Sequence, residues 1–334
     1  MPRLAYQDGK PRLALLLSWT MVVSMNSVLV FVSGAADHPL AAHHLAKVEH
    51  LLDEAHVELF ANPEWLHLHK AAEMQIEGSL SPAQFTHLRH ALGEESIDVF
   101  MLPQQGRKKA LLLADMDATI VTTETLDELA DFAGLRERIS AITQRAMCGE
   151  LNFHMALNER VSLLEGLPLS ALEKTAASTQ LSSGAETLVK VMRNNGATCV
   201  LVSGGFTYFT ERIAQKCGFQ IHHGNHLDIK DGVLTGKVLP PFLDKNAKYY
   251  FLQKYAAELG LAADETLAIG DGANDLPMLQ GAGLGLGYRP KPLVYESVSN
   301  AIIHTDLTSA LYVQGYTEAD LKSAFVTESE PRND

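Results

Sequence analysis

Cysteine and basic residues are scarce in this chain of 334 residues, and each shortage excludes a class of protein. The three cysteines, Cys148, Cys199 and Cys217, are odd in number and form no C-x-x-C pair. They support neither a disulfide scaffold nor a cysteine zinc site, so we expect small buried thiols in a reducing cytoplasm. Lysine and arginine number 27 against 40 acidic residues, a net charge of −13. Nucleic acids and anionic membranes are therefore poor partners.

Long apolar runs are also rare. The segment Leu13–Ser33 has the basic flank and apolar stretch of an export signal or a membrane anchor. Polar residues interrupt its middle, and two strands, Leu13–Trp19 and Val28–Val32, explain the pattern as well. We therefore expect a cytoplasmic protein, with membrane contact as the alternative. With 46% hydrophobic residues, the chain has enough apolar surface for two or three folded domains.

Residues 1–105 form a predicted N-terminal α+β module. Two strand-like runs precede a helical pattern from about His38 to Leu59, and a second helix is predicted around Ser81–Leu92. Nine of the 14 histidines lie in this module, with His43 and His50 seven residues apart. We interpret these histidines as a solvated helix face rather than a metal site.

An α/β pattern begins after residue 105. Three short apolar runs, Ala110–Ala114, Ala197–Val202 and Thr266–Ile269, each lead into polar or glycine residues, and helical patterns separate them. This alternation predicts a doubly wound, mostly parallel sheet with a ligand site at the carboxyl ends of its strands. The predicted units are a catalytic core in 106–121 and 180–325, an inserted helical cap in 122–179, and a polar tail in 326–334.

The three strand ends carry a set of acids and small polar residues. They are Asp115, Asp117, Ser203, Asp271, Asn274 and Asp275. Several carboxylates at one edge of a sheet require a cation, and all-oxygen ligands favour Mg²⁺ over zinc. This composition suits phosphoryl transfer.

A carboxylate can attack phosphorus once the repulsion between the two anions is neutralised. Asp115 would form an aspartyl phosphate, while Asp117 would protonate the leaving oxygen and later deprotonate water. Ser203 and the Gly204 and Gly205 amides can hold phosphate oxygens, and Lys248 can supply a positive charge.

These residues resemble the motifs of the haloacid dehalogenase-like superfamily. The matching segments are Asp115–Ile120, Ser203–Gly205, Lys248 and Gly270–Asp275. The resemblance implies that Asp115 is the nucleophile and Asp117 the acid/base. It also implies Mg²⁺ on Asp115, Asp271 and the main-chain carbonyl of Asp117, and phosphate on Ser203, Gly204 and Lys248 near Asn274. Asp275 would orient bound water or Lys248. Ala118 departs from the serine that many members have.

Segments of the predicted cap are similar to the phosphoserine phosphatases of that superfamily. They are Thr123–Ala130, Arg145–Phe153 and Arg160–Leu164. The resemblance implies that Glu124 and Arg160 bind the ammonium and carboxylate of phosphoserine, and a forked guanidinium suits a carboxylate. Met147 and Phe153 would close over the substrate. The implied activity is hydrolysis of phosphoserine, the last step of serine synthesis.

Other interpretations remain open. The chain could hydrolyse another small phosphomonoester, and the module in 1–105 could be an amino-acid-sensing unit of the ACT type or a homodimer contact. The glycines from Gly281 to Gly287 lack G-x-G-x-x-G spacing. We interpret them as closely packed backbone around a late strand.

Overall fold

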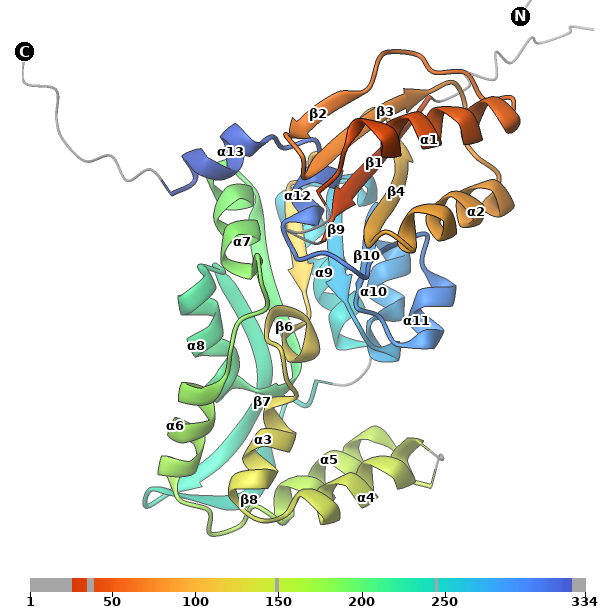
Figure 1. Ribbon diagram of the computed structural model, residues 1–334. Coiled ribbons are helices and arrows are strands. Elements are labelled where there is room, and N and C mark those ends of the chain that lie inside the picture. The colour runs from red at the N-terminus through yellow and green to blue at the C-terminus, as the bar shows by residue number, and fades with distance from the viewer. Residues whose placement is uncertain (1–25, 35–38, 148–149, 244–245, 326–334) are drawn as a thin grey trace, which may run out of the picture.

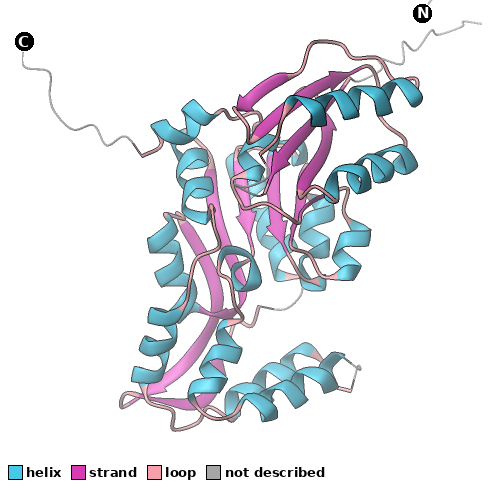
Figure 2. Cartoon of the chain, in the orientation of Figure 1, coloured by secondary structure: helices cyan, strands magenta, loops and turns pink. Residues whose placement is uncertain are grey.

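A computed structural model describes residues 26–34, 39–147, 150–243 and 246–325, except the side chains of Ala146, Met147 and Phe153. These residues form a four-stranded and a seven-stranded sheet with helices around them (Figures 1 and 2). The predicted strand Leu13–Trp19 lies outside the described residues. Within them, no helix has both the length and the apolar character needed to cross a bilayer.

The four-stranded sheet is antiparallel in the order β2-β3-β1-β4. The chain order strand–helix–strand–strand–helix–strand is that of a ferredoxin-like unit. Its elements are β1 Ser27–Ser33, α1 Ala42–Glu54, β2 Glu64–His67, β3 Ala71–Ile76, α2 Pro82–Gly93 and β4 Ile97–Pro103. We call these residues the N-terminal unit.

Strand β1 is apolar throughout because it faces two hydrophobic cores. Leu29 and Phe31 pack with α1 and α2, whereas Val28, Val30 and Val32 join the core of the larger sheet. A strand buried on both faces has a continuous apolar sequence, which a membrane segment also has. The same pattern therefore permitted both interpretations of this segment.

Three predictions for the N-terminal unit need correction. Helix α1 is shorter than predicted, since the chain turns out of it at His56 with a φ of 54°. Strands β2, β3 and β4 were not foreseen. His43 and His50 are exposed as expected, but His44 is buried and its Nε2 lies 2.9 Å from Glu95.

His44 is not suited to hold a metal in this arrangement. Its Nδ1 accepts the backbone N–H of Ala41 at 2.9 Å, so Nε2 carries the ring proton and donates it to Glu95. Lys47 also donates to Glu95 at 2.7 Å. The group is a hydrogen-bonded link between α1 and the end of α2.

The seven-stranded sheet has the order β11-β10-β9-β5-β6-β7-β8, parallel except for the β7–β8 pair. The predicted α/β class with a mostly parallel sheet is confirmed.

Asp231 and Gly232, with φ of 52° and 76°, form the tight turn of the β7–β8 hairpin. The strands are β5 Leu111–Ala114, β6 Thr198–Phe206, β7 Ile221–Lys230, β8 Val233–Leu239, β9 Thr266–Gly270, β10 Leu284–Tyr288 and β11 Asn300–Ile302.

Helices cover both faces of this sheet. Helices α7, α8 and α12 pack on one face, and α9, α10 and α11 pack on the other. A Cβ at Gly285 would lie 2.1 Å from the carbonyl oxygen of Leu279, so the glycine run is closely packed as predicted. The helices are α7 Ala185–Asn194, α8 Thr207–Cys217, α9 Ala247–Leu259, α10 Leu276–Gly281, α11 Pro292–Ser297, α12 Ser309–Val313 and α13 Glu318–Ser323.

Between β5 and β6 the chain makes a helical excursion. The two ends of this excursion lie next to each other, because Val121 pairs with Leu181 in an antiparallel bridge. The far end is attached to the β7–β8 hairpin, since Gly166 donates to the carbonyl of Leu234 at 2.8 Å. This excursion contains α3 Thr125–Phe132, α4 Arg136–Met147, α5 Phe153–Ser162 and α6 Leu169–Ser178.

Hydrogen bonds fasten the N-terminal unit to the larger sheet. The buried carboxylate of Asp98 on β4 accepts the backbone N–H groups of Ile303, His304 and Thr305 at 3.0–3.2 Å. Asn300 exchanges two side-chain hydrogen bonds with the backbone of Met101. The two sheets are therefore joined by hydrogen bonds as well as by a shared hydrophobic core.

Candidate active site

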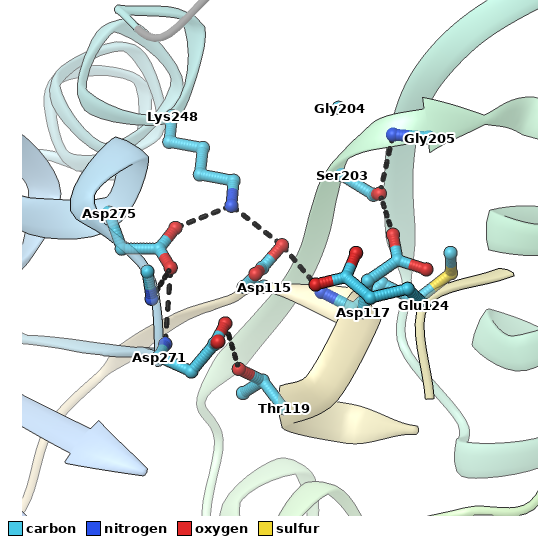
Figure 3. A network of polar contacts seen from close by, with 12 residues as sticks. Asp115, Asp117, Thr119, Glu124, Ser203, Gly204, Gly205, Lys248, Asp271 and Asp275 are labelled. Carbon is cyan, nitrogen blue, oxygen red and sulfur yellow. Dashed lines mark hydrogen bonds and ion pairs between the residues drawn. The ribbon is translucent and has the colours of Figure 1, made fainter. Parts of the chain in front are cut away.

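Acidic and small polar residues meet at the carboxyl ends of the adjacent strands β9, β5 and β6 (Figure 3). Asp115 follows β5 directly, and its backbone N–H donates to the carbonyl of Ile269 on β9 at 3.0 Å. The sheet therefore fixes its backbone. Asp117 lies in the following turn Met116–Ile120, in which its own backbone is extended and Ala118 has a φ of 53°. This turn brings two carboxylates to one strand end.

Asp115 lies in a buried ion-pair network. Its Oδ1 is 2.6 Å from Nζ of Lys248, which projects from the first turn of α9. Burial raises the pKa of Asp115 well above its usual range, the Asp275 carboxylate adds to this, and Lys248 acts in the opposite direction. Burial alone would lower the pKa of Lys248, but the two carboxylates outweigh it and raise the pKa. Lys248 is therefore a fixed positive charge beside Asp115.

Asp275 holds Lys248 and the loop after β9. Its Oδ1 pairs with Lys248, and its Oδ2 accepts the backbone N–H groups of Asp271 and Gly272 at 3.1 and 3.0 Å. A Cβ at Gly270 would lie 2.5 Å from the Asp275 carboxyl group, so glycine is required there. Both oxygens of Asp275 are engaged, which fits a positioning role.

Asp117 is oriented by three hydrogen bonds. Its Oδ1 accepts the backbone N–H and the hydroxyl of Thr125 at 2.8 and 2.7 Å, and its Oδ2 accepts the hydroxyl of Ser203 at 2.7 Å. The Ser203 hydroxyl in turn accepts the N–H of Gly205 at 2.8 Å. A Cβ at Gly205 would approach Oδ2 of Asp117 to 3.1 Å. Residues from β6 and α3 thus set the direction of the Asp117 side chain.

A cavity of about 180 Å³ opens above these groups. Its lining includes the three carboxylates Asp115, Asp117 and Asp271, together with Asn274, Gly204 and Gly205. Glu124, at the start of α3, and Arg160, on α5, line it from the helical excursion. The volume is below that of pockets for drug-sized ligands, so the cavity suits a small molecule.

Glu124 and Arg160 supply opposite charges to the lining of this cavity. Partial burial raises the pKa of Glu124 to about 7, and the carboxylate of Asp117 contributes to this. Burial lowers the pKa of Arg160, against the attraction of Asp127 and Glu124, but a guanidinium remains charged in proteins. Arg160 Nε donates to the Ala156 carbonyl at 3.2 Å, which anchors the guanidinium to its own helix.

The structure adds a residue that the sequence did not suggest. Lys291 Nζ lies 3.0 Å from Oδ2 of Asp271 and 3.6 Å from Oε1 of Glu124. Its backbone N–H also donates to the Asp271 carbonyl at 2.9 Å. Lys291 lies three residues beyond β10, a fourth parallel strand whose carboxyl end faces the same edge. Its place just after a strand end was the one sequence feature that could have marked Lys291 as a candidate site residue.

Three buried carboxylates lie close enough to share one metal ion. Ligand oxygens of Asp115, Asp271 and Asp275 lie within 4.8 Å of one another. With Asp117, four acids face the two cations Lys248 and Lys291, and uncompensated buried negative charge favours a cation. Because Asp275 is already engaged, Asp115 and Asp271 are better placed to bind the ion. The residues therefore fit a metal site.

Most of the sequence-derived candidates meet at this site. Asp115, Asp117, Glu124, Arg160, Gly204, Gly205, Asp271 and Asn274 line the cavity, and Ser203, Lys248 and Asp275 contact its acids. The backbones of Met147 and Phe153 lie at the end of α4 and the start of α5. Their side chains lie outside the described residues, so their closure over a substrate stays a prediction.

Known proteins resemble this chain in sequence and in fold. The family model for haloacid dehalogenase-like hydrolases matches residues 112–280. A phosphoserine phosphatase of Streptomyces coelicolor is 33% identical over 293 residues, which are 86% of this chain and 71% of that protein.

Two solved structures extend the comparison. A probable phosphoserine phosphatase of Vibrio cholerae is 27% identical with a TM-score of 0.71, covering 89% of this chain and 88% of that one. A substrate-bound phosphoserine phosphatase complex is 40% identical with a TM-score of 0.57, covering 61% of this chain and 98% of that one.

Proposed function

The chain belongs to the haloacid dehalogenase-like hydrolases, and we propose that it hydrolyses O-phospho-L-serine to L-serine and phosphate. The observation that carries the substrate assignment is the pair of opposite charges in the cavity. Glu124 and Arg160 line the same small space as Asp115 and Asp117. An amino acid presents an ammonium and a carboxylate, and this pair complements both.

The first chemical step forms a bond between an Asp115 carboxylate oxygen and phosphorus. The bond from phosphorus to the serine oxygen breaks, and its electron pair stays on that oxygen. Asp117 donates a proton to the leaving oxygen, as its fixed orientation by Thr125 and Ser203 allows. The products are free serine and an aspartyl phosphate on Asp115.

The second step hydrolyses the aspartyl phosphate. Asp117, now deprotonated, accepts a proton from the attacking water, and the bond between phosphorus and Asp115 breaks. Phosphate leaves and the Asp115 carboxylate is restored. The Gly204 amide, Asn274, Ser203 and the Lys248 ammonium are proposed to hold the phosphate oxygens during both steps.

We propose Mg²⁺ as the metal, held by Asp115, Asp271 and the main-chain carbonyl of Asp117. The donors are all oxygens, which suits a hard cation. When bound, the ion neutralises negative charge on the phosphate and on Asp115. Lys291 pairs with Oδ2 of Asp271. Oδ1 of Asp271, 3.4 Å from the Thr119 hydroxyl, is the oxygen that we propose for the ion.

We also propose that the enzyme acts in the cytoplasm, at the last step of serine synthesis. Support comes from Cys199 and Cys217, which are free and buried, and burial raises the pKa of both thiols to about 12. Unpaired, unreactive thiols are typical of a reducing compartment.

The test compares two substrates in an Arg160→Met variant. Loss of a charge-assisted hydrogen bond costs about 1.5–3 kcal/mol, so KM for phosphoserine should rise about 10- to 150-fold. The kcat/KM for phenyl phosphate, which has no amino-acid group, should stay within about twofold of wild type. Arg138→Met, at an exposed position of α4, is the matched control. Equal losses on both substrates would contradict the substrate assignment.

A further inference from the structure

A second and larger cavity lies between the N-terminal unit and the seven-stranded sheet. It measures about 760 Å³, against about 180 Å³ for the active-site cavity. Residues of α2 and β4 form one wall, and the segment from the end of β10 through α11 to β11 forms the other. In Figure 1, α2 and α11 lie on the same side of the molecule. We call this space the inter-unit cleft.

The walls of the inter-unit cleft are mainly apolar. Ile97 and Val99 come from β4, and Pro292, Tyr295 and Ile303 come from the opposite wall. The volume is in the range that encloses small organic ligands, and such sites combine apolar walls with a few polar groups.

Two arginines face the cleft without an acidic partner. Among the described residues, neither Arg89 of α2 nor Arg289 after β10 forms an ion pair. The Arg89 guanidinium lies 4.8 Å from the Tyr295 ring centroid, and its Nη2 is buried with no hydrogen-bond partner. A buried donor without a partner is costly and uncommon, and a ligand oxygen would satisfy it.

The two acidic residues that line the cleft form no ion pair with these arginines in the part of the chain that the structure describes. Asp98 is fully engaged by the backbone N–H groups of Ile303, His304 and Thr305 and by the Thr305 hydroxyl. Glu94 is exposed at the C-terminal end of α2. The lining thus holds two arginines and two acidic residues, and among its described side chains the Arg89 guanidinium has a buried donor without a partner.

Backbone strain marks the same wall. Arg289 has a φ of 42°, in the left-handed region that favours glycine, and its N–H donates to the Ile302 carbonyl at 2.7 Å. Strained backbone persists where the surroundings enforce it, often at ligand sites. Two residues later, Lys291 reaches the active site through its bonds to Asp271. The cleft wall is thus continuous with a residue of the catalytic cavity.

We propose that the inter-unit cleft binds a small organic carboxylate with a flat apolar body. The carboxylate pairs with the Arg89 guanidinium, and the apolar body lies against Tyr295 and the β4 side chains. This site is separate from the catalytic cavity, and its occupant differs from phosphoserine in carrying an apolar group.

The experiment uses three ligands of the same shape and different charge on the full chain. Benzoate, benzamide and benzamidine are titrated, and binding is followed by ligand-observed NMR. Benzoate should bind with a Kd on the order of 1 mM, as a fragment of its size allows, and at least tenfold tighter than the other two. Arg89→Met should weaken benzoate binding at least tenfold.

Two controls locate the bound benzoate. Arg160→Met removes the arginine of the catalytic cavity and should leave benzoate affinity unchanged, as should Arg212→Met, an exposed arginine stacked on Tyr208. If Arg89→Met fails to fold, Tyr295→Leu replaces it with the same expectation. Equal affinity for the three ligands, no binding of benzoate, or loss of binding in Arg160→Met would overturn the proposal.

Discussion

Lys248 neutralises part of the buried negative charge of the active site, since it pairs with both Asp115 and Asp275. Its replacement by methionine gives a quantitative test. Lys248→Met keeps much of the apolar stem but leaves Asp115 and Asp275 buried without their shared cation. Removal of one partner of a buried ion pair typically costs about 3–5 kcal/mol. We therefore expect a loss of that size in the free energy of unfolding at pH 8 in EDTA.

The loss should depend on pH in a defined direction. Burial and mutual repulsion raise the pKa of Asp115 above its unfolded value, so the folded variant binds more protons than the unfolded chain. Its stability therefore falls as pH rises and recovers as pH falls. If the folded variant binds one more proton than the unfolded chain, its free energy of unfolding changes by about 1.36 kcal/mol per pH unit. Over three pH units the change is at most about 4 kcal/mol. At pH 5 the variant should approach wild-type stability.

Urea titrations at pH 5 and pH 8 measure both quantities. Lys254→Met, at a half-buried position of the same helix, is the matched control and should change stability by no more than about 1 kcal/mol. Addition of Mg²⁺ at pH 8 should stabilise the Lys248 variant more than wild type, since the ion replaces the missing charge. The reasoning that Lys248 offsets the buried carboxylates would be refuted by either of two results. One is a Lys248→Met variant as stable as wild type at pH 8, and the other is a loss of stability that is larger at pH 5 than at pH 8.

Three further predictions follow from other parts of the molecule. Asp98→Ala leaves three backbone N–H groups unpaired and should cost at least about 3 kcal/mol in a urea titration, whereas exposed Asp131→Ala should cost no more than about 0.5 kcal/mol. Because the pKa of Glu124 is about 7, KM for phosphoserine relative to phenyl phosphate should rise about tenfold from pH 8 to pH 6, and Glu124→Gln should abolish that dependence. Gly285→Ala places a Cβ against the Leu279 carbonyl and should cost about 3 kcal/mol or more by thermal or urea unfolding; a neutral effect would contradict the close packing.

The strand-end residues could be predicted because the carboxyl ends of parallel strands meet at one edge of a sheet. Asp115, Ser203 and Asp271 each follow a short apolar run, so their convergence needs no knowledge of tertiary contacts. Helices were expected in 122–179 from local patterns of the same kind, and α3, α4, α5 and α6 lie there. Local sequence patterns were sufficient for both.

Other features depend on partners far away in the sequence. Strand β3 contains the buried Glu73, which no strand pattern favours, and its partner Arg107 lies 34 residues further along the chain. Lys291 likewise gains its position from Asp271, on the neighbouring strand end. In both cases a distant ion pair sets the structure, and the local pattern gives no sign of it.

The most direct test of the proposed function is phosphate release from L-phosphoserine in the presence of Mg²⁺. Wild type should prefer phosphoserine over a panel of small phosphate esters and should lose activity in EDTA. Asp115→Asn should abolish turnover, while Asp131→Asn, an exposed carboxylate of α3, should leave it unchanged. Phosphoserine turnover that survives in Asp115→Asn, or a wild type that hydrolyses other esters and not phosphoserine, would contradict the account.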